Sequence, residues 1–142
     1  MSLRRLLLVL GLVAASAKVL TGRLQRAEIQ GESMRPALRP GDCVIADRRA
    51  YRTHPPRPGD VVLAHDPRNF DRLLVKRVAR VHADGAVELR GDNPAASTDS
   101  RDFGAVPPYL IEGRILGRYW PWPSVARRRS TSASVGNASS GG

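Results

Sequence analysis

The chain has 142 residues, enough for one domain with a hydrophobic core but not for two domains of ordinary size. Its formal net charge is +10 at pH 7, and 21 of its 23 basic residues are arginine. The single cysteine, Cys43, excludes an intrachain disulfide, and the three scattered histidines lack the spacing of a metal site. The sequence therefore indicates a small basic domain with no metal and no cofactor.

Residues 1–27 contain an apolar run from Leu6 to Ala17, which is short for a bilayer crossing of about 20 residues. We interpret this segment as a single N-terminal apolar helix that anchors the chain to a membrane. Two alternatives stay open, a cleaved signal peptide with Ala15-Ser16-Ala17 at its cleavage site and a helix of the core. Orientation stays open as well, because basic residues flank the run on both sides: Arg4, Arg5, Lys18, Arg23 and Arg26.

Residues 28–123 combine short β patterns with Pro- and Gly-rich turns. Asp84-Gly85 is a good tight-turn pair and predicts a hairpin. We predict a mainly β fold, a small antiparallel domain preceded by the N-terminal helix. After a lead-in at 27–30, the strand candidates are 43–47, 60–65, 73–82, 86–90 and 111–120.

The last segment, residues 124–142, is rich in Ser, Gly and Arg and has too few apolar residues to bury a core. We predict that it is a disordered basic tail. Its triplet Arg127-Arg128-Arg129 can contact anionic lipid, although a solvated tail is the simpler interpretation.

Ser33 lies in a Gly- and Pro-rich loop, where a serine is most often a turn hydroxyl. Two later stretches give it a chemical setting. Lys76 sits inside an apolar run, and Ser97 belongs to a polar stretch that begins at Gly91. A hydroxyl, a partly buried amine and a second hydroxyl are the parts of a Ser-Lys hydrolase.

Lys76 is one of only two lysines in the chain. Alternation along a strand places it on one face with Leu74, Val78 and Arg80. Apolar neighbours and a nearby cation both lower the pKa of a lysine. A lysine that is neutral near pH 7 can take the proton of Ser33 as the hydroxyl attacks a peptide carbonyl. The alternative is a surface lysine whose stem covers the sheet.

Other residues are candidates for supporting roles. Gly31 permits close backbone approach, so the N–H of Ser33 can help to bind an oxyanion. Ser97 is a candidate to orient the lysine amine. Asp99 and Arg101 lie on the same side of a predicted extended segment, where they can pair and brace the loop. By itself this stretch is equally consistent with a plain turn.

A Ser-His-Asp triad is the rival catalytic interpretation, and it needs a histidine near Ser33 with a carboxylate behind it. His65-Asp66 and His82-Ala83-Asp84 sit at strand ends or in turns, without a recognisable setting. We therefore favour the Ser-Lys interpretation.

Five stretches, in this order, resemble the boxes of the type I signal peptidase family, peptidase family S26, over residues 29–120. They are Ser33-Met34-x-Pro36-x-Leu38, Gly41-Asp42, Gly59-Asp60-Val61-Val62, Val75-Lys76-Arg77-Val78 and Gly91-Asp92-Asn93-x-x-x-Ser97-x-Asp99-Ser100-Arg101. The resemblance implies a membrane-anchored serine endopeptidase with a Ser-Lys dyad on a β fold.

The resemblance also implies a role for each matching residue. Ser33 would be the nucleophile and Lys76 the base. Ser97 would orient the lysine, while Asp99 and Arg101 would form a structural pair.

Two departures from the family pattern matter. Only residues 77–90 separate the last two boxes, where larger members carry a long insertion, so the chain is similar to mitochondrial inner-membrane proteases and to nickel superoxide dismutase maturation proteases. Gly31 stands where some members have a serine that helps to bind the oxyanion, and glycine brings no such side-chain donor.

The leading hypothesis is removal of signal peptides or pro-peptides from precursor proteins, after small residues. A dedicated maturation protease for one precursor, such as nickel superoxide dismutase, is an alternative. A self-cleaving protease like the SOS-response repressors would need a DNA-binding domain or a cleavage loop ahead of Ser33. A basic nucleic-acid-binding β domain would need exposed aromatics beside basic residues. Trp120 and Trp122 resemble a closing plug or membrane-facing patch instead, so we expect no nucleic-acid partner.

Overall fold

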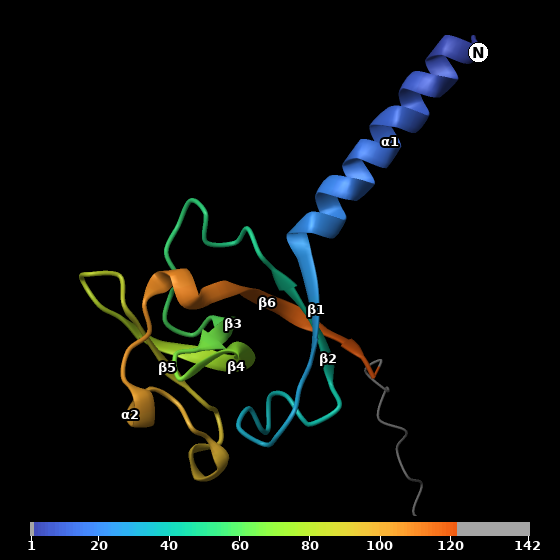
Figure 1. Ribbon diagram of the computed structural model, residues 1–142. Coiled ribbons are helices and arrows are strands. Elements are labelled where there is room, and N and C mark those ends of the chain that lie inside the picture. The colour runs from blue at the N-terminus through green and yellow to red at the C-terminus, as the bar shows by residue number, and fades with distance from the viewer. Residues whose placement is uncertain (1, 122–142) are drawn as a thin grey trace, which may run out of the picture.

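The computed structural model describes residues 2–121, so the predicted tail at 124–142 lies outside the described residues. A helix and a six-stranded sheet dominate the described chain (Figure 1). The predicted mainly β fold with one N-terminal helix is confirmed. In chain order the elements are α1 (Leu3–Arg23), β1 (Leu24–Glu28), β2 (Cys43–Asp47), β3 (Val61–Asp66), β4 (Asn69–Val81), β5 (Val87–Arg90), η1 (Pro94–Ala96), α2 (Ser100–Phe103), η2 (Pro108–Leu110) and β6 (Ile111–Trp120).

The sheet is antiparallel throughout, in the order β1-β2-β6-β3-β4-β5. The last strand, β6, lies between β2 and β3 and joins the two halves of the sheet. The hairpin predicted around Asp84-Gly85 connects β4 to β5. Gly85 has a φ of 87°, and the N–H of Ala86 donates to the Asp84 carboxylate. The turn residues thus set the pairing of these two strands.

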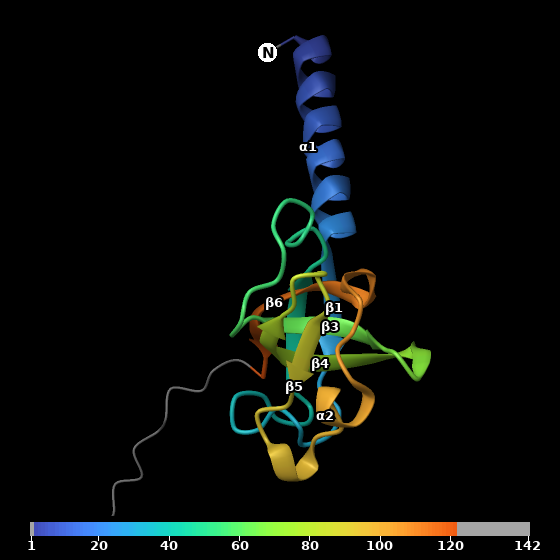
Figure 2. The same cartoon turned by 90° about the vertical axis from the view of Figure 1, so that its left-hand side faces the viewer.

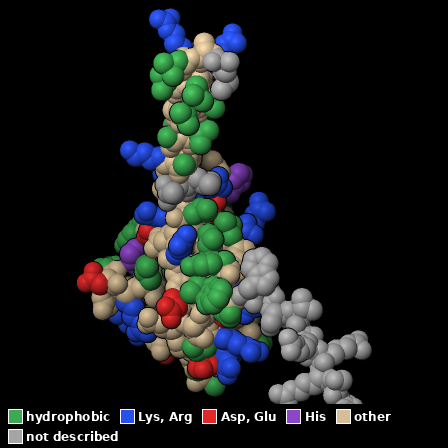
Figure 3. Space-filling view, turned by 90° about the vertical axis from the view of Figure 1, so that its right-hand side faces the viewer, with side chains coloured by type: hydrophobic (Ala, Val, Ile, Leu, Met, Phe, Trp, Pro, Cys, Tyr) green, Lys and Arg blue, Asp and Glu red, His purple; other side chains and the backbone are tan. Residues whose placement is uncertain are grey.

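Helix α1 projects away from the sheet (Figures 1 and 2). Figure 3 shows hydrophobic side chains along it. Leu8 and Leu12 are among its exposed residues. The core-helix alternative is therefore wrong. Between residues 2 and 121, the structure contains no helix with the length and hydropathy that a membrane crossing requires. Strand β1 follows the helix directly, and it includes the end of the segment that we assigned to the anchor.

The core consists of two clusters of buried side chains. The first is formed by side chains of β3, β4 and β5 together with two residues that follow α2. It comprises Val62, Ala64, Val78, Val87, Leu89, Val106 and Leu110. The second comprises Ile29, Met34, Leu38 and Val44. Two members of the second cluster, Met34 and Leu38, come from the loop that carries Ser33, so hydrophobic burial fixes this loop to the sheet.

Gly113 gives a test of how tightly β6 packs. A Cβ atom at this position would lie 2.6 Å from the carbonyl oxygen of Asp47. We expect Gly113→Ala to lower the free energy of unfolding by about 1–3 kcal/mol, the usual effect of overpacking. Gly117 on the same strand has no such neighbour, so Gly117→Ala should change it by less than about 0.5 kcal/mol. Urea denaturation measures both, and equal effects would contradict the packing argument.

Candidate active site

A hydrogen bond joins the two ends of the loop that carries Ser33, and a buried side chain holds the middle of the loop in place. The N–H of Ile29 donates to the carbonyl of Asp42 at 2.8 Å, which brings the two ends of the loop together. Met34, directly after Ser33, is 1% exposed. Gly31 has a φ of 83°, in the left-handed region that glycine reaches without a steric penalty. Ser33 is therefore half-buried on a fixed turn.

Ser33 and Lys76 line the same cleft, which has a volume of about 460 Å³. One wall is formed by residues 26–34, and the other includes residues 71–76 of β4. Strand β1 is at the edge of the sheet, and β4 pairs with β5 only from Arg77 onward. The cleft thus runs between two strand edges with free backbone hydrogen-bonding groups.

Lys76 is buried, with 4% of its surface exposed. It shares its face of β4 with the buried side chains of Leu74 and Val78, as alternation along the strand predicted. Burial lowers the pKa of Lys76 because it removes water from around the ammonium.

Charges around Lys76 act in both directions. The carboxylate of Asp99 raises the pKa of Lys76, but it does not overcome burial together with three cations. The prediction that Arg80 acts on Lys76 is wrong. Arg80 is exposed and lies beyond a bulge that interrupts the strand pairing after Val78. The cations that lower the pKa of Lys76 are Arg72, Arg101 and Arg68.

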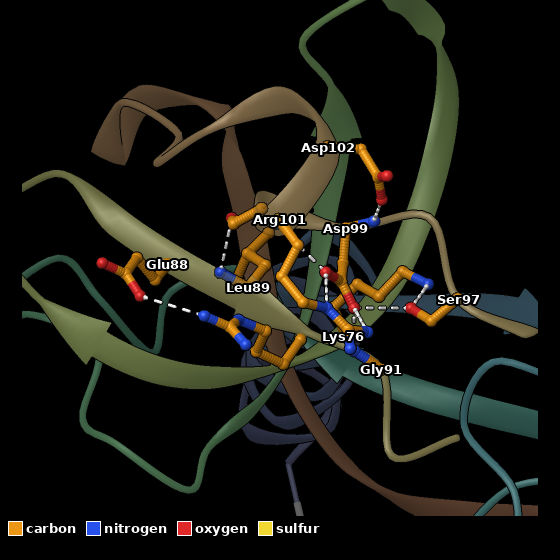
Figure 4. Close-up of polar contacts among 10 residues, drawn as sticks. Lys76, Glu88, Leu89, Gly91, Ser97, Asp99, Arg101 and Asp102 are labelled. Atoms are coloured by element: carbon orange, nitrogen blue, oxygen red, sulfur yellow. Dashed lines mark hydrogen bonds and ion pairs between the residues drawn. The ribbon is translucent and has the colours of Figure 1, made fainter. Parts of the chain in front are cut away.

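A chain of hydrogen bonds runs from Lys76 through Ser97 to Asp99 (Figure 4). The amine Nζ donates to Ser97 Oγ at 3.0 Å, and the Ser97 hydroxyl donates to Asp99 Oδ2 at 2.7 Å. Because the hydroxyl proton is directed to the carboxylate, the oxygen presents its lone pairs to the amine. The predicted contact between Ser97 and the lysine is present.

Asp99 is fully buried, at 0% exposed. The Arg101 guanidinium donates two hydrogen bonds to its carboxylate oxygens, at 2.9 and 2.7 Å. The N–H of Gly91 donates to the same carboxylate at 2.9 Å. Burial acts to raise the pKa of Asp99, but the hydrogen bonds from Arg101, Gly91 and Ser97 outweigh it and hold this pKa far below its ordinary value.

The predicted pairing of Asp99 with Arg101 is thus present, but the extended segment is wrong beyond Asp99. Asp99 caps the short helix α2, and its own N–H bonds to the Asp102 carboxylate. This is a capping box, which starts a helix where the sequence analysis placed extended chain.

Two residues that the sequence analysis gave no role connect the two loops. The N–H of Asn93 donates to the carbonyl of Ser33 at 2.8 Å, and its side-chain amide donates to the carbonyl of Glu32 at 3.2 Å. A Cβ at Gly91 would lie 2.2 Å from Ser97 Oγ and 2.7 Å from the Ser33 carbonyl oxygen. Only glycine allows the two serine-bearing loops to meet here.

The third connection is an ion pair between Arg77 and Asp92. Arg77 Nε and Nη2 donate to the two carboxylate oxygens of Asp92, each at 2.8 Å. Arg77 Nη1 donates to the carbonyl of Gly59 at 2.8 Å. The pair therefore holds three of the five boxes together. In the sequence, Gly91, Asp92, Asn93 and Arg77 were marked only by lying inside the boxes that resemble the family.

The two histidines of the triad alternative are engaged elsewhere. His65 hydrogen-bonds to Glu112 at 2.9 Å and to the carbonyl of Phe70, and His82 hydrogen-bonds to Glu88 at 2.9 Å. Neither histidine lines the Ser33 cleft among the described residues. The geometry therefore gives no support to a Ser-His-Asp triad.

Comparison with known proteins gives the family. The model of the family described as "Signal peptidase, peptidase S26" matches residues 2–85. Mitochondrial ATP-independent inner membrane protease subunit 1a of Arabidopsis thaliana is 36% identical over 120 residues, covering 69% of this chain and 71% of the relative. Mitochondrial inner membrane protease subunit 1 of Homo sapiens is 33% identical over 110 residues, covering 64% and 66%. The chain belongs to the signal peptidase family and is a signal-peptidase-type protease, as the five boxes indicated.

Gly91→Ala tests the junction between the two loops. The added methyl group would force Ser97 away from Ser33, and a shift of about 1 Å at reacting groups is enough for about a 100-fold loss. We expect peptidase activity to fall by at least about 100-fold while circular dichroism shows a retained sheet. Gly117→Ala, where a Cβ meets open space, should keep normal activity. A fully active Gly91→Ala protein would show that the close approach is unimportant.

Proposed function

We propose that this protein is a serine endopeptidase in which Ser33 is the nucleophile and Lys76 the general base. The observation that carries the proposal is a buried lysine with a lowered pKa in the same cleft as a serine on a pinned loop. A buried amine gives up its proton at a lower pH, and the neutral form can accept a proton from a hydroxyl. Membership of the signal peptidase family supports the same assignment.

The reaction proceeds through an acyl-enzyme. Ser33 Oγ attacks the peptide carbonyl while its proton moves to Lys76 Nζ. The ammonium then gives this proton to the leaving amine as the peptide bond breaks. Lys76 next takes a proton from water as the water attacks the ester, and returns this proton to Ser33 Oγ as the ester bond breaks and the acid product leaves. The N–H of Ser33, on the turn that follows Gly31, stabilises the oxyanion in both halves of the reaction.

Ser97 is the residue that orients the base. Its hydroxyl accepts an N–H of the amine, so the lone pair of a neutral Lys76 is directed elsewhere, toward the cleft. Asp99 and Arg101 hold Ser97 in this orientation. Support of this kind for a reacting group is typically worth about 10- to 100-fold in activity.

The substrate enters as an extended chain between the free edges of β1 and β4, where it can pair with both strands. The residues before the cut lie in the cleft, whose apolar lining includes Ile29, Met34 and Leu74. This environment suits the small residues that the family resemblance implies before the cleavage site. We therefore propose that the protein removes signal peptides or pro-peptides from precursor proteins.

A dedicated maturation protease for one precursor is the second candidate. The cleft is also lined by charged side chains on both walls, Arg26 and Glu28 on one side and Asp71 and Arg72 on the other. Charged walls favour substrates with matching polar residues over a wide range of apolar segments. This observation supports a narrow substrate range.

We propose that α1 holds the protein at a membrane as a single N-terminal anchor, because its apolar side chains are exposed and the relatives are named inner membrane proteases. Several of the arginines have a structural use. Many described arginines are paired with carboxylates rather than displayed to phosphates, which favours protein precursors over nucleic acid as partners. The pairs include Arg23–Asp47, Arg68–Asp66, Arg77–Asp92, Arg101–Asp99 and Arg118–Asp42.

Lys76→Arg separates a base from a structural cation. Guanidinium keeps the charge but does not deprotonate at any pH the protein survives. We expect cleavage of precursor peptides, read by mass spectrometry, to be lost as completely as in Ser33→Ala, with at most a modest loss of stability. Lys18→Arg, at the other lysine, should keep full activity. Substantial cleavage by Lys76→Arg would remove Lys76 from the mechanism.

Arg101→Gln should move the pH profile. In the wild type, kcat/KM rises with pH as Lys76 loses its proton, with a midpoint below the roughly 10.4 of a free lysine. Removing the Arg101 cation leaves the Asp99 charge less compensated, which raises the pKa of Lys76. The acid limb should therefore shift to higher pH, whereas Arg52→Gln, at an exposed arginine that does not line the cleft, should leave it in place. A shift to lower pH would contradict this electrostatic account.

A further inference from the structure

A second depression lies beside the active-site loop and shares no lining residue with the cleft. It is lined by Arg35, Pro36, Arg39, Asp92, Asn93 and Pro94. The two turns that form it are joined at Asn93, whose N–H donates to the carbonyl of Ser33. The depression therefore adjoins the active-site loop at Ser33 while lying outside the cleft.

The depression is cationic because its one carboxylate is already used. Both oxygens of Asp92 are bound by Arg77, which lies outside the depression. Arg35 forms an ion pair with Glu32, but the side chains are 49% and 46% exposed, and such pairs are weak and readily exchanged.

Arg39 supplies the uncompensated charge. Within residues 2–121 its side chain forms no hydrogen bond or ion pair with another side chain. The nearby carboxylate of Asp42 is buried, accepts the backbone N–H of Arg39, and pairs with the guanidinium of Arg118 instead. An exposed guanidinium without a partner is suited to two-point binding of a carboxylate.

We propose that this depression binds the precursor residues that follow the scissile bond and selects an acidic side chain there through Arg39, assisted by Arg35. The inference rests on the proposed function, because it needs a peptide that passes Ser33. The direct connection between Asn93 and Ser33 favours a substrate carboxylate over an anionic lipid headgroup.

Peptides that differ only by Glu or Lys at each of the first four positions after the cut provide the test. The wild type should prefer Glu at one position by about 3- to 20-fold in kcat/KM, the range for an exposed attraction replaced by a repulsion. Arg39→Gln should remove most of this preference and Arg39→Glu should reverse it. Arg52→Gln, at an exposed arginine outside both the cleft and the depression, is the matched control and should leave it unchanged.

Binding of the same peptides to Ser33→Ala, followed by fluorescence anisotropy, separates this inference from the proposed function. Charge-dependent binding without wild-type cleavage would retain the depression and overturn the protease mechanism. Cleavage without charge preference, or a preference that Arg39→Glu leaves intact, would overturn the inference alone. An effect of Arg39→Glu confined to precursors in anionic vesicles would identify a lipid site and also overturn it.

Discussion

The buried carboxylate of Asp99 is the constraint on which the site depends. An unpaired charge at such a position typically destabilises a protein by about 3–5 kcal/mol, so every surrounding donor has to stay in place. Ser97 and Arg101 supply donors from the same short stretch, and the N–H of Gly91 supplies another. Residues 91–101 therefore form a self-contained loop, whose position against Ser33 is fixed through Asn93.

This loop gives Lys76 an anchor without giving it a counter-ion. A carboxylate in direct contact would favour the ammonium and raise the pKa of Lys76. Instead, the neutral hydroxyl of Ser97 stands between Lys76 and Asp99, and Arg72, Arg101 and Arg68 oppose the effect of the carboxylate charge on Lys76. Burial then decides the balance, and the pKa of Lys76 falls. The arrangement orients the amine while leaving its proton easy to remove.

Strands that show an apolar alternation, and turns with characteristic residues, could be predicted from the sequence. Strands β2 and β6 have their predicted bounds, whereas β4 begins at Asn69, four residues earlier than expected, because its exposed first part pairs with β3 without an apolar alternation. The contacts of Lys76 with Ser97 and of Asp99 with Arg101 could be expected from the residue types and their order. The role of Gly91 could not be expected, because a close approach of two backbones leaves no pattern in one sequence. Arg77 and Asp92 pair across the fold, which composition alone does not reveal.

In a chain with 21 arginines and two lysines, the lysine at position 76 stands out. Several half-exposed or exposed arginines in this chain hold carboxylates by two-point contacts and never lose their charge. Position 76 is buried and has no carboxylate in direct contact, so a charge there is compensated only by the more distant Asp99, beyond the Ser97 hydroxyl. Lysine can enter such a site because it can shed its proton. The same loss of a proton is what the proposed mechanism requires of Lys76 as a base, so in that mechanism the fold and the chemistry favour the same residue.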